Sequence, residues 1–130
     1  MIRKLGVDCS ESDRIQFVHD WVKLCASGKT VEAFDLLDSP LDTTRHTWTP
    51  EDFREVTFDH FDDEKFPTVT DPETVEGTIR KDTFEYNDGS GWGLEFDLPL
   101  NGIVSDFTLM FDFIKVGGEL KVIMDDCHVM

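Results

Sequence analysis

The chain has 130 residues, 39% of them hydrophobic, with 11 phenylalanines and a formal net charge of −16. This aromatic content excludes a disordered chain, and the length suits a single domain over residues 1–130 with a core of its own. The negative charge disfavours binding to nucleic acid phosphates or anionic lipid. No apolar run approaches the roughly 18 residues of a membrane span, and the basic start of the chain lacks the apolar segment of a signal peptide. We therefore expect a cytoplasmic protein without a nucleic-acid or membrane partner.

The three cysteines, Cys9, Cys25 and Cys127, are odd in number, widely spaced and without a Cys-x-x-Cys motif. This pattern favours reduced thiols and argues against a disulfide framework or a zinc site. We expect no metal and no cofactor.

The first forty residues have the apolar spacing of two helices. Ser10 or Ser12 can cap the first, and Gly28 suits the left-handed position just after its end. Thr30 then caps a short second helix that ends before Pro40. We expect this helix to bury three side chains, those of Val31, Phe34 and Leu37.

A third helix is expected to begin at Thr49-Pro50, because threonine can cap it and proline is favoured at the first helical position. Trp48, directly before the cap, has two interpretations. It can be the hydrophobic staple of this helix start, or it can lie at the mouth of a pocket.

Acidic residues concentrate between positions 51 and 76, where ten acids and two bases give a net charge of −8, half of the total. Such a run is either a solvated helix end with its loop or a docking patch for a basic protein. A divalent cation is a third interpretation, but the Asp-x-Asp-x-Asp-Gly framework of a calcium loop is missing. The candidate partner-binding residues are Asp59, Asp62, Asp63 and Glu64.

Beyond the third helix the apolar spacing changes to an alternation of two, which is typical of strands. The alternation predicts a strand over residues 78–86, followed by a turn over 87–91. It then predicts a second strand over 92–98, with an apolar residue at every second position. Pro99 either ends this strand or places it at an edge. The predicted helices precede the predicted antiparallel strands, and this order indicates an α+β fold, with N-terminal helices packed on a curved antiparallel sheet.

Gly117-Gly118 between two β-rich runs predicts a two-residue hairpin turn. In the register set by that turn, Leu109 faces Asp126 and Phe107 faces His128. Asp126 and His128 then share one face at the end of an apolar wall, where they could transfer protons as a catalytic pair. The alternative is that this polar pair marks the rim of the sheet. The candidate pocket residues are Trp48, Phe107 and Leu109.

Neighbouring residues on a strand point to opposite faces, so the same register also defines the other face of the hairpin. That face is mixed in character, and it is either a homodimer interface or a solvated surface. Its members are Thr108, Met110, Ile114, Ile123 and Cys127.

Residues 18–37 consist of a helix, a break at Ser27-Gly28-Lys29, and a second helix that ends in the pair Leu36-Leu37. Followed by a β-meander, this order resembles the cystatin-like cone of the nuclear transport factor 2-like (SnoaL-like) superfamily. The resemblance implies a curved sheet around an interior, in a superfamily of isomerases, dehydratases, cyclases, binding proteins and protein-interaction modules. The stretches 97–100 and 125–129 also look like small bacterial proteins of unassigned function.

Two classes of function are compatible with these patterns. One is a non-enzymatic protein-interaction module, for example an immunity-type inhibitor, whose acidic surface binds a basic partner. The other is a small-molecule-binding or lyase/isomerase-type protein, which would hold a small hydrophobic ligand inside the cone near Asp126 and His128.

Overall fold

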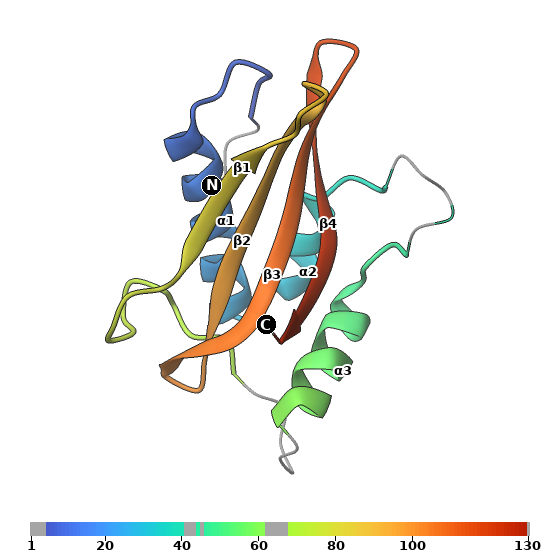
Figure 1. Cartoon of the computed structure of the whole chain (residues 1–130). Coiled ribbons are helices and arrows are strands. Elements are labelled where there is room, and N and C mark those ends of the chain that lie inside the picture. The colour runs from blue at the N-terminus through green and yellow to red at the C-terminus, as the bar shows by residue number, and fades with distance from the viewer. Residues whose placement is uncertain (1–4, 41–43, 45, 62–67, 130) are drawn as a thin grey trace.

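The computed structural model describes residues 5–40, 44, 46–61 and 68–129, over which three helices are followed by four strands (Figure 1). The predicted α+β fold, with N-terminal helices on an antiparallel sheet, is confirmed. Over the described residues, none of the helices combines the length and the apolar character that a membrane crossing requires. The elements are α1 (Glu11–Ala26), α2 (Thr30–Asp35), α3 (Pro50–Phe61), β1 (Lys81–Glu85), β2 (Gly91–Leu100), β3 (Ile103–Val116) and β4 (Glu119–Val129).

The four strands form one antiparallel sheet in the order β1-β2-β3-β4. Asn101 and Gly102 connect β2 to β3 with φ angles of 53° and 84°, and Gly117 and Gly118 connect β3 to β4 at 56° and 82°. Positive φ at both central residues is the signature of a primed turn, whose twist matches that of the flanking strands. The predicted Gly117-Gly118 turn is therefore confirmed.

Reciprocal capping fixes the starts of α1 and α3. The Ser10 hydroxyl accepts the Asp13 N–H at 3.1 Å, while the Asp13 carboxylate accepts the Ser10 N–H at 3.0 Å. Thr49 and Asp52 repeat this arrangement at α3, with both distances 3.2 Å. Gly28, at φ 83°, follows α1 in the predicted left-handed conformation.

The start of α2 differs from the prediction. Thr30 is the first helical residue rather than the cap, and Lys29 precedes it without a side-chain capping bond. Val31 is 64% exposed, whereas Ala33 and Phe34 are buried. A helix of six residues offers only a narrow stripe to the core, and these two residues occupy it.

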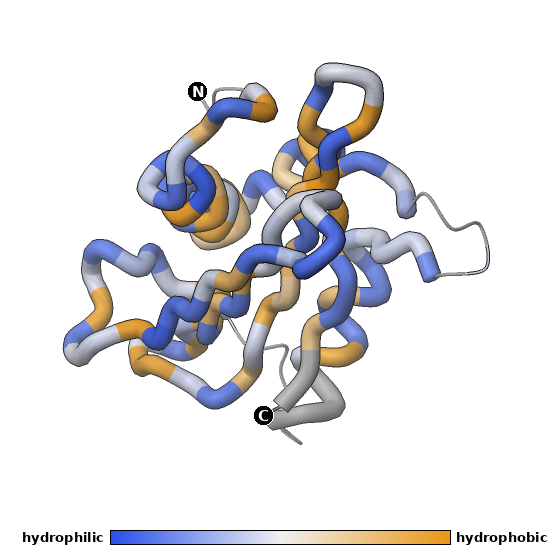
Figure 2. Tube along the Cα trace, turned by 45° about the horizontal axis from the view of Figure 1, so that its top comes forward, coloured by the Kyte–Doolittle hydropathy of each residue, from blue (hydrophilic) through white to orange (hydrophobic). Residues whose placement is uncertain are grey.

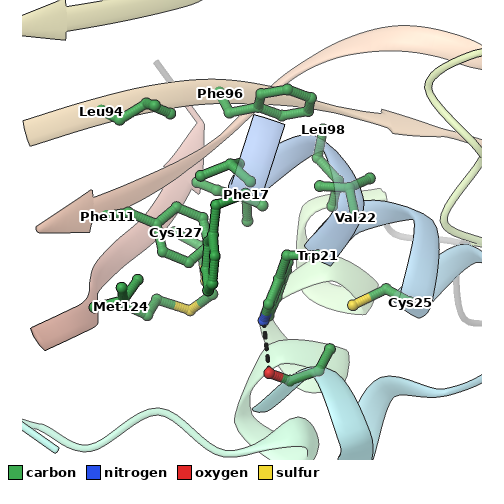
Figure 3. Packing of buried hydrophobic residues seen from close by; sticks show 14 of the residues in the cluster. Phe17, Trp21, Val22, Cys25, Leu94, Phe96, Leu98, Phe111, Met124 and Cys127 are labelled. Atoms are coloured by element: carbon green, nitrogen blue, oxygen red, sulfur yellow. Dashed lines mark hydrogen bonds between the residues drawn. The ribbon is translucent and has the colours of Figure 1, made fainter. Parts of the chain in front are cut away.

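Trp21 is at the centre of the hydrophobic core (Figure 3). Its ring is fully buried, and its indole N–H donates to the Ala33 carbonyl at 2.8 Å, which fixes α1 against α2. Its ring centroid lies 5.2 Å from that of Phe34, 6.1 Å from Phe53 and 5.3 Å from Phe111. These edge-to-face contacts join α1 to α2, α3 and β3.

Trp92, near the start of β2, contacts two cations. The Arg14 guanidinium is 4.0 Å from a Trp92 ring centroid and the Lys115 ammonium is 4.7 Å away. Arg14 is itself buried, and it donates to the Cys9 carbonyl at 3.0 Å. These cation–π contacts attach the first turn of α1 to the sheet.

Hydrophilic and hydrophobic residues alternate along parts of the strands (Figure 2). Successive side chains of a strand point to opposite faces, so this alternation gives the sheet two different faces. We call the face covered by α1 and α2 the inner face and the opposite one the outer face (Figure 1). The inner face supplies the strand part of the core, whose buried members include Leu94, Phe96, Leu98, Phe107, Leu109, Phe111, Phe113, Leu120, Val122, Met124 and Cys127.

Strand β2 continues through Pro99 after a register shift between Asp97 and Pro99. By then β1 has ended, because its first residue, Lys81, pairs with Phe96. The Thr70 N–H donates to the Pro99 carbonyl at 2.9 Å instead. Proline therefore removes no donor from the β1–β2 ladder. Of the two alternatives for Pro99, the end of the strand is wrong, because β2 continues to Leu100 at a point where β1 no longer pairs with it.

Candidate functional site

An extra residue in β4 changes the pairing at the far end of the hairpin. The predicted register holds from the turn as far as Phe111–Met124, but Met110 then lies opposite Asp126. Asp125 is the additional residue, a β-bulge. The observed pairs are Leu109–Cys127, Thr108–His128 and Phe107–Val129, so the predicted pairs Leu109–Asp126 and Phe107–His128 are wrong.

The bulge exchanges the expected faces of Asp126 and Cys127. Asp126 lies opposite Met110 on the outer face, and its carboxylate accepts the Cys127 N–H at 2.8 Å. Cys127 is 2% exposed within the core, so its predicted place on the outer face is wrong. Burial raises the pKa of this thiol to about 12. The sheet itself therefore separates Asp126 from the apolar wall of Phe107 and Leu109.

The three predicted pocket residues occupy two different places. Phe107 and Leu109 have no exposed surface and belong to the packed core. Trp48 is partly buried beside β4, where its indole N–H donates to the Asp125 carbonyl at 3.4 Å. It lines a pocket of about 270 Å³ together with side chains that include Phe34, Leu37, Pro40 and Met124.

The acidic candidates around α3 are described only in part. Asp59 lies within α3, whereas Asp62, Asp63 and Glu64 fall outside the described residues. At the start of α3, the Asp52 carboxylate lies 2.8 Å from His46 Nε2. Desolvation raises the pKa of Asp52, but hydrogen bonds from Thr49 and His46 outweigh it, so the pKa lies below its ordinary value of 3.8.

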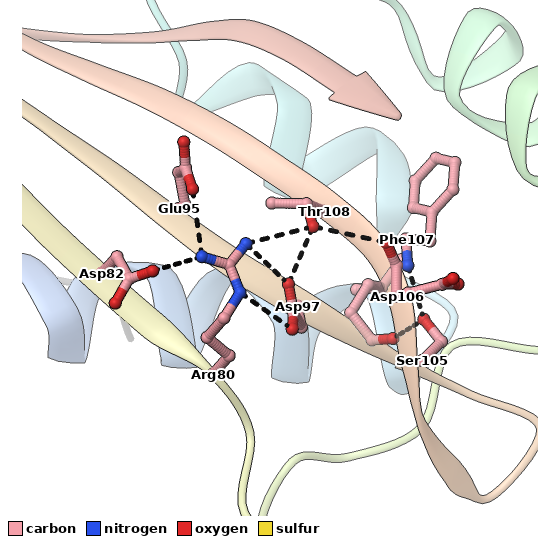
Figure 4. A network of polar contacts seen from close by, with 9 residues as sticks. Arg80, Asp82, Glu95, Asp97, Ser105, Asp106, Phe107 and Thr108 are labelled. Carbon is pink, nitrogen blue, oxygen red and sulfur yellow. Dashed lines mark hydrogen bonds and ion pairs between the residues drawn. The ribbon is translucent and has the colours of Figure 1, made fainter. Parts of the chain in front are cut away.

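A charged network crosses the outer face around Arg80, just before β1 (Figure 4). Its guanidinium donates to both oxygens of Asp97, from Nε at 3.2 Å and from Nη2 at 3.1 Å. Its Nη1 donates to Glu95 at 3.1 Å and also to Asp82. The Thr108 hydroxyl donates to Asp97 at 2.7 Å. The bonds to Asp97 and Glu95 raise the pKa of Arg80, and three carboxylates around one guanidinium leave the cluster negative.

A shallow depression of about 520 Å³ lies on the outer face between the turn that joins β1 to β2 and the strands β3 and β4. The Tyr86 hydroxyl donates to the Asp112 carboxylate there. Hydrogen bonds from Ser90 lower the pKa of Asp88 below its ordinary value. The lining residues include three acids and no base, and they are Tyr86, Asn87, Asp88, Ser90, Asp112 and Asp125.

The sequence predicted this outer face only as a homodimer interface or a solvated surface, and the acidic cluster on it was not predicted. Its signal is present in the alternation, because Glu95 and Asp97 separate apolar neighbours on β2, and Asp112 does the same on β3. What a single sequence does not reveal is that Arg80 binds both Glu95 and Asp97, and that Tyr86 binds Asp112. Over the described residues, no group of three or more His, Cys, Asp or Glu side chains has the geometry to hold a metal ion.

Searches among curated proteins and among solved structures returned no match to the chain. A family model does match, over residues 51–130, which include α3 and the whole sheet but neither α1 nor α2. Because this match covers more than half of the chain, the protein belongs to the family described as Domain of unknown function (DUF7668).

Proposed function

We propose that this protein is a non-enzymatic protein-interaction module that binds a basic partner through the outer face of its sheet, as an immunity-type inhibitor would. The observation that carries the proposal is the charge of that face. Its acids come from all four strands, and they outnumber its bases, of which Arg80 is already bound by Asp82, Glu95 and Asp97.

Two acids of the outer face, Asp97 and Asp112, are largely buried and are held in place before any partner arrives. Asp97 is fixed by Arg80 and Thr108, and Asp112 accepts a hydrogen bond from Tyr86. Rigid strands carry these groups, so little side-chain entropy is lost on binding. A surface of one charge sign also accelerates association with an oppositely charged protein, in a salt-dependent manner.

The charge of the outer face argues against the sheet-face homodimer that the sequence left open. Two copies stacked face to face would oppose two surfaces of the same charge sign, each with Asp82, Asp125 and Asp126 at least partly exposed. Like charges brought together at an interface cost several kcal/mol. A basic protein is the better complement to this surface.

For the finer fold, we propose the cystatin-like cone of the SnoaL-like superfamily. The element order supports this, since two N-terminal helices and α3 precede an antiparallel meander with one covered face. The fold by itself does not select a function, because this architecture carries both enzymes and binding modules.

A second candidate function is the binding of a small hydrophobic ligand beside Trp48. The favouring observation is the pocket of about 270 Å³ there, with Phe34, Leu37 and Met124 among its lining side chains. This volume is close to the lower end of about 300 Å³ that is typical of ligand sites. The ligand would lie between α2 and β4 rather than around Asp126.

The test of the proposed function is capture of partners from a cell lysate with matched variants of equal charge. One variant combines Asp112→Asn, Asp125→Asn and Asp126→Asn on the outer face. Its control combines Glu11→Gln, Glu32→Gln and Glu51→Gln, three exposed helix residues. We expect the wild type and the control to retain a basic protein that elutes at high salt, and the outer-face variant to bind it at least about tenfold more weakly.

A further variant, with Asp59, Asp62, Asp63 and Glu64 replaced by their amides, tests the other acidic surface. If only this variant loses the partner, the binding site lies at the end of α3 and not on the outer face. Equal binding by all variants, or a partner without basic character, would contradict the proposal. A spectral change of Trp48 on adding small hydrophobic compounds would then favour the second candidate.

A further inference from the structure

The two edges of the sheet are covered to different degrees. On β4, the Asp38 N–H donates to the Val122 carbonyl at 2.7 Å, and the Asp38 carboxylate accepts the Val122 N–H at 2.9 Å. The Trp48 indole also donates to the Asp125 carbonyl. Side chains and loop backbone thus satisfy the outward groups at the middle of β4, as proteins commonly protect an edge strand.

The other edge, β1, is open. The Asp97 N–H donates to the Arg80 carbonyl at 3.1 Å, and the Tyr86 N–H donates to the Gly91 carbonyl at 3.0 Å. Bonding alternates along an antiparallel ladder, so the residues of β1 at odd positions direct their N–H and C=O groups away from β2. Over the described residues no hydrogen bond engages the outward backbone groups, which belong to Lys81, Thr83 and Glu85.

We propose that a second copy of this chain pairs with the β1 edge, antiparallel, about a two-fold axis at Thr83. In this arrangement Thr83 of one chain lies opposite Thr83 of the other. Lys81 of each chain then lies opposite Glu85 of the other chain. All three outward-facing residues of β1 then form hydrogen-bonded pairs with the same three residues of the copy. The interface is isologous, as closed two-fold dimers require.

Charge complementarity selects a second copy as the occupant. In this register each Lys81 ammonium meets a Glu85 carboxylate of the other chain, and opposite charges directly across a strand pair stabilise it. A shift of the register by two residues in either direction loses both of these pairs. The strand is therefore self-complementary in one register, although the whole chain carries a net charge of −16.

Phe84 gives a second reason for pairing at this edge. Its side chain lies on the outer face over Gly93 and is 44% exposed, one of the few large hydrophobic side chains that are. In the proposed register the two Phe84 residues lie diagonally across the new strand pair. Diagonal neighbours are about 7–8 Å apart, within reach of aromatic rings, so each ring would cover part of the other.

The test is the mass of the full chain in solution, measured by sedimentation over a concentration series at about 0.15 M salt. At this salt the Debye length is about 8 Å, so net repulsion between the chains is screened. We expect a monomer–dimer equilibrium in the wild type. A wild-type chain that stays monomeric up to about 1 mM would overturn the proposal.

Thr83→Pro tests the backbone pairing. The Thr83 N–H points away from β2, so proline removes no bond of the β1–β2 ladder but removes one donor from each copy at the dimer axis. We expect dimerisation to weaken at least about tenfold. Dimerisation that is unchanged by Thr83→Pro would place the interface elsewhere.

Charge reversal tests the register and does not depend on the folding of the proline variant. Lys81→Glu alone and Glu85→Lys alone should each weaken the dimer, because like charges then meet twice across the axis. An equimolar mixture of the two variants should dimerise again, since both cross-strand pairs regain opposite charges. The controls are Lys29→Glu and Glu32→Lys, which change the net charge equally on exposed residues away from β1. Failure of the mixture to recover would contradict the proposed register.

Discussion

At the residue scale, Asp125 decides which side chains of β4 face the core. A regular ladder would turn Asp126 inward against Leu109, where a carboxylate without a charged partner would be costly to bury. With one extra residue, the carboxylates of Asp125 and Asp126 stay out of the core and Cys127 fills the inner position. Two consecutive acids in a strand of alternating hydropathy are therefore the sequence signal of this bulge.

A pair of serine substitutions checks the observed register. Cys127→Ser should lower the free energy of unfolding by about 1–3 kcal/mol, because it places a hydroxyl in the apolar core. Asp126→Ser should change it by less than about 1 kcal/mol, since position 126 faces outward. Urea denaturation measures both values. The opposite order of effects would support the regular register instead.

At the element scale, the features that depend on neighbouring residues in the sequence could be predicted. The caps at Ser10 and Thr49, the left-handed Gly28 and the Gly117-Gly118 turn all follow from local backbone chemistry. Features that depend on distant segments could not be predicted. Residue Thr70, for example, supports β2 beyond β1, and this contact has no signature near Pro99.

The same division applies to the candidate site. Alternation correctly placed Phe107 and Leu109 on one apolar face, but they were predicted to line a pocket, and they belong to the packed core instead. The chemistry beside it was misplaced, because alternation assumes an unbroken ladder, and the bulge at Asp125 breaks it. The role of Arg80 depends on contacts between three strands, which no spacing within one strand encodes.

The cap of α3 gives a pH-dependent prediction. Asp52→Asn should destabilise the protein by about 1 kcal/mol at pH 7, because it removes the charge of the capping carboxylate beside His46. The folded-state pKa of Asp52 is lowered, so its contribution is present above the ordinary value of 3.8 and is lost as the pH falls through the folded value.

Thermal or urea unfolding of the wild type and Asp52→Asn between pH 7 and pH 2 measures this difference. The two stabilities should converge in acid. A constant difference over the whole range would mean that Asp52 acts through packing rather than through its charge. Thr49→Ala, which removes the hydroxyl acceptor of the same cap, should weaken α3 at every pH and serves as the comparison.

At the scale of the whole molecule, the region that defines the family is not the region that forms the complete core. The family match begins at residue 51, but α1 and α2 supply Phe17, Trp21 and Phe34 to the inner face. Without them the apolar residues of β2, β3 and β4 would face water. The inner face of the sheet, which lies in the matched region, therefore has to pack against another segment. In this chain, the N-terminal helices α1 and α2 fill that role.

A fragment of residues 51–130 tests this dependence. We expect it to lack cooperative unfolding and to bind a hydrophobic dye, because the inner face stays exposed. Addition of a peptide of residues 1–50 should reduce dye binding and restore part of the near-ultraviolet circular dichroism. A fragment that unfolds cooperatively on its own would show that α1 and α2 are dispensable for the fold.

The three tryptophans make the molecule its own optical reporter. Trp21 is buried in the core, and its N–H donates to a backbone carbonyl. Trp48 lies at the β4 edge, and Trp92 makes cation–π contacts with Arg14 and Lys115. Each ring thus has a different polarity and charge around it. Variants that keep one tryptophan and replace the other two by phenylalanine would separate their signals. Emission spectra during unfolding would then report on the core from Trp21, on the β4 edge from Trp48, and on the contact of α1 with the sheet from Trp92.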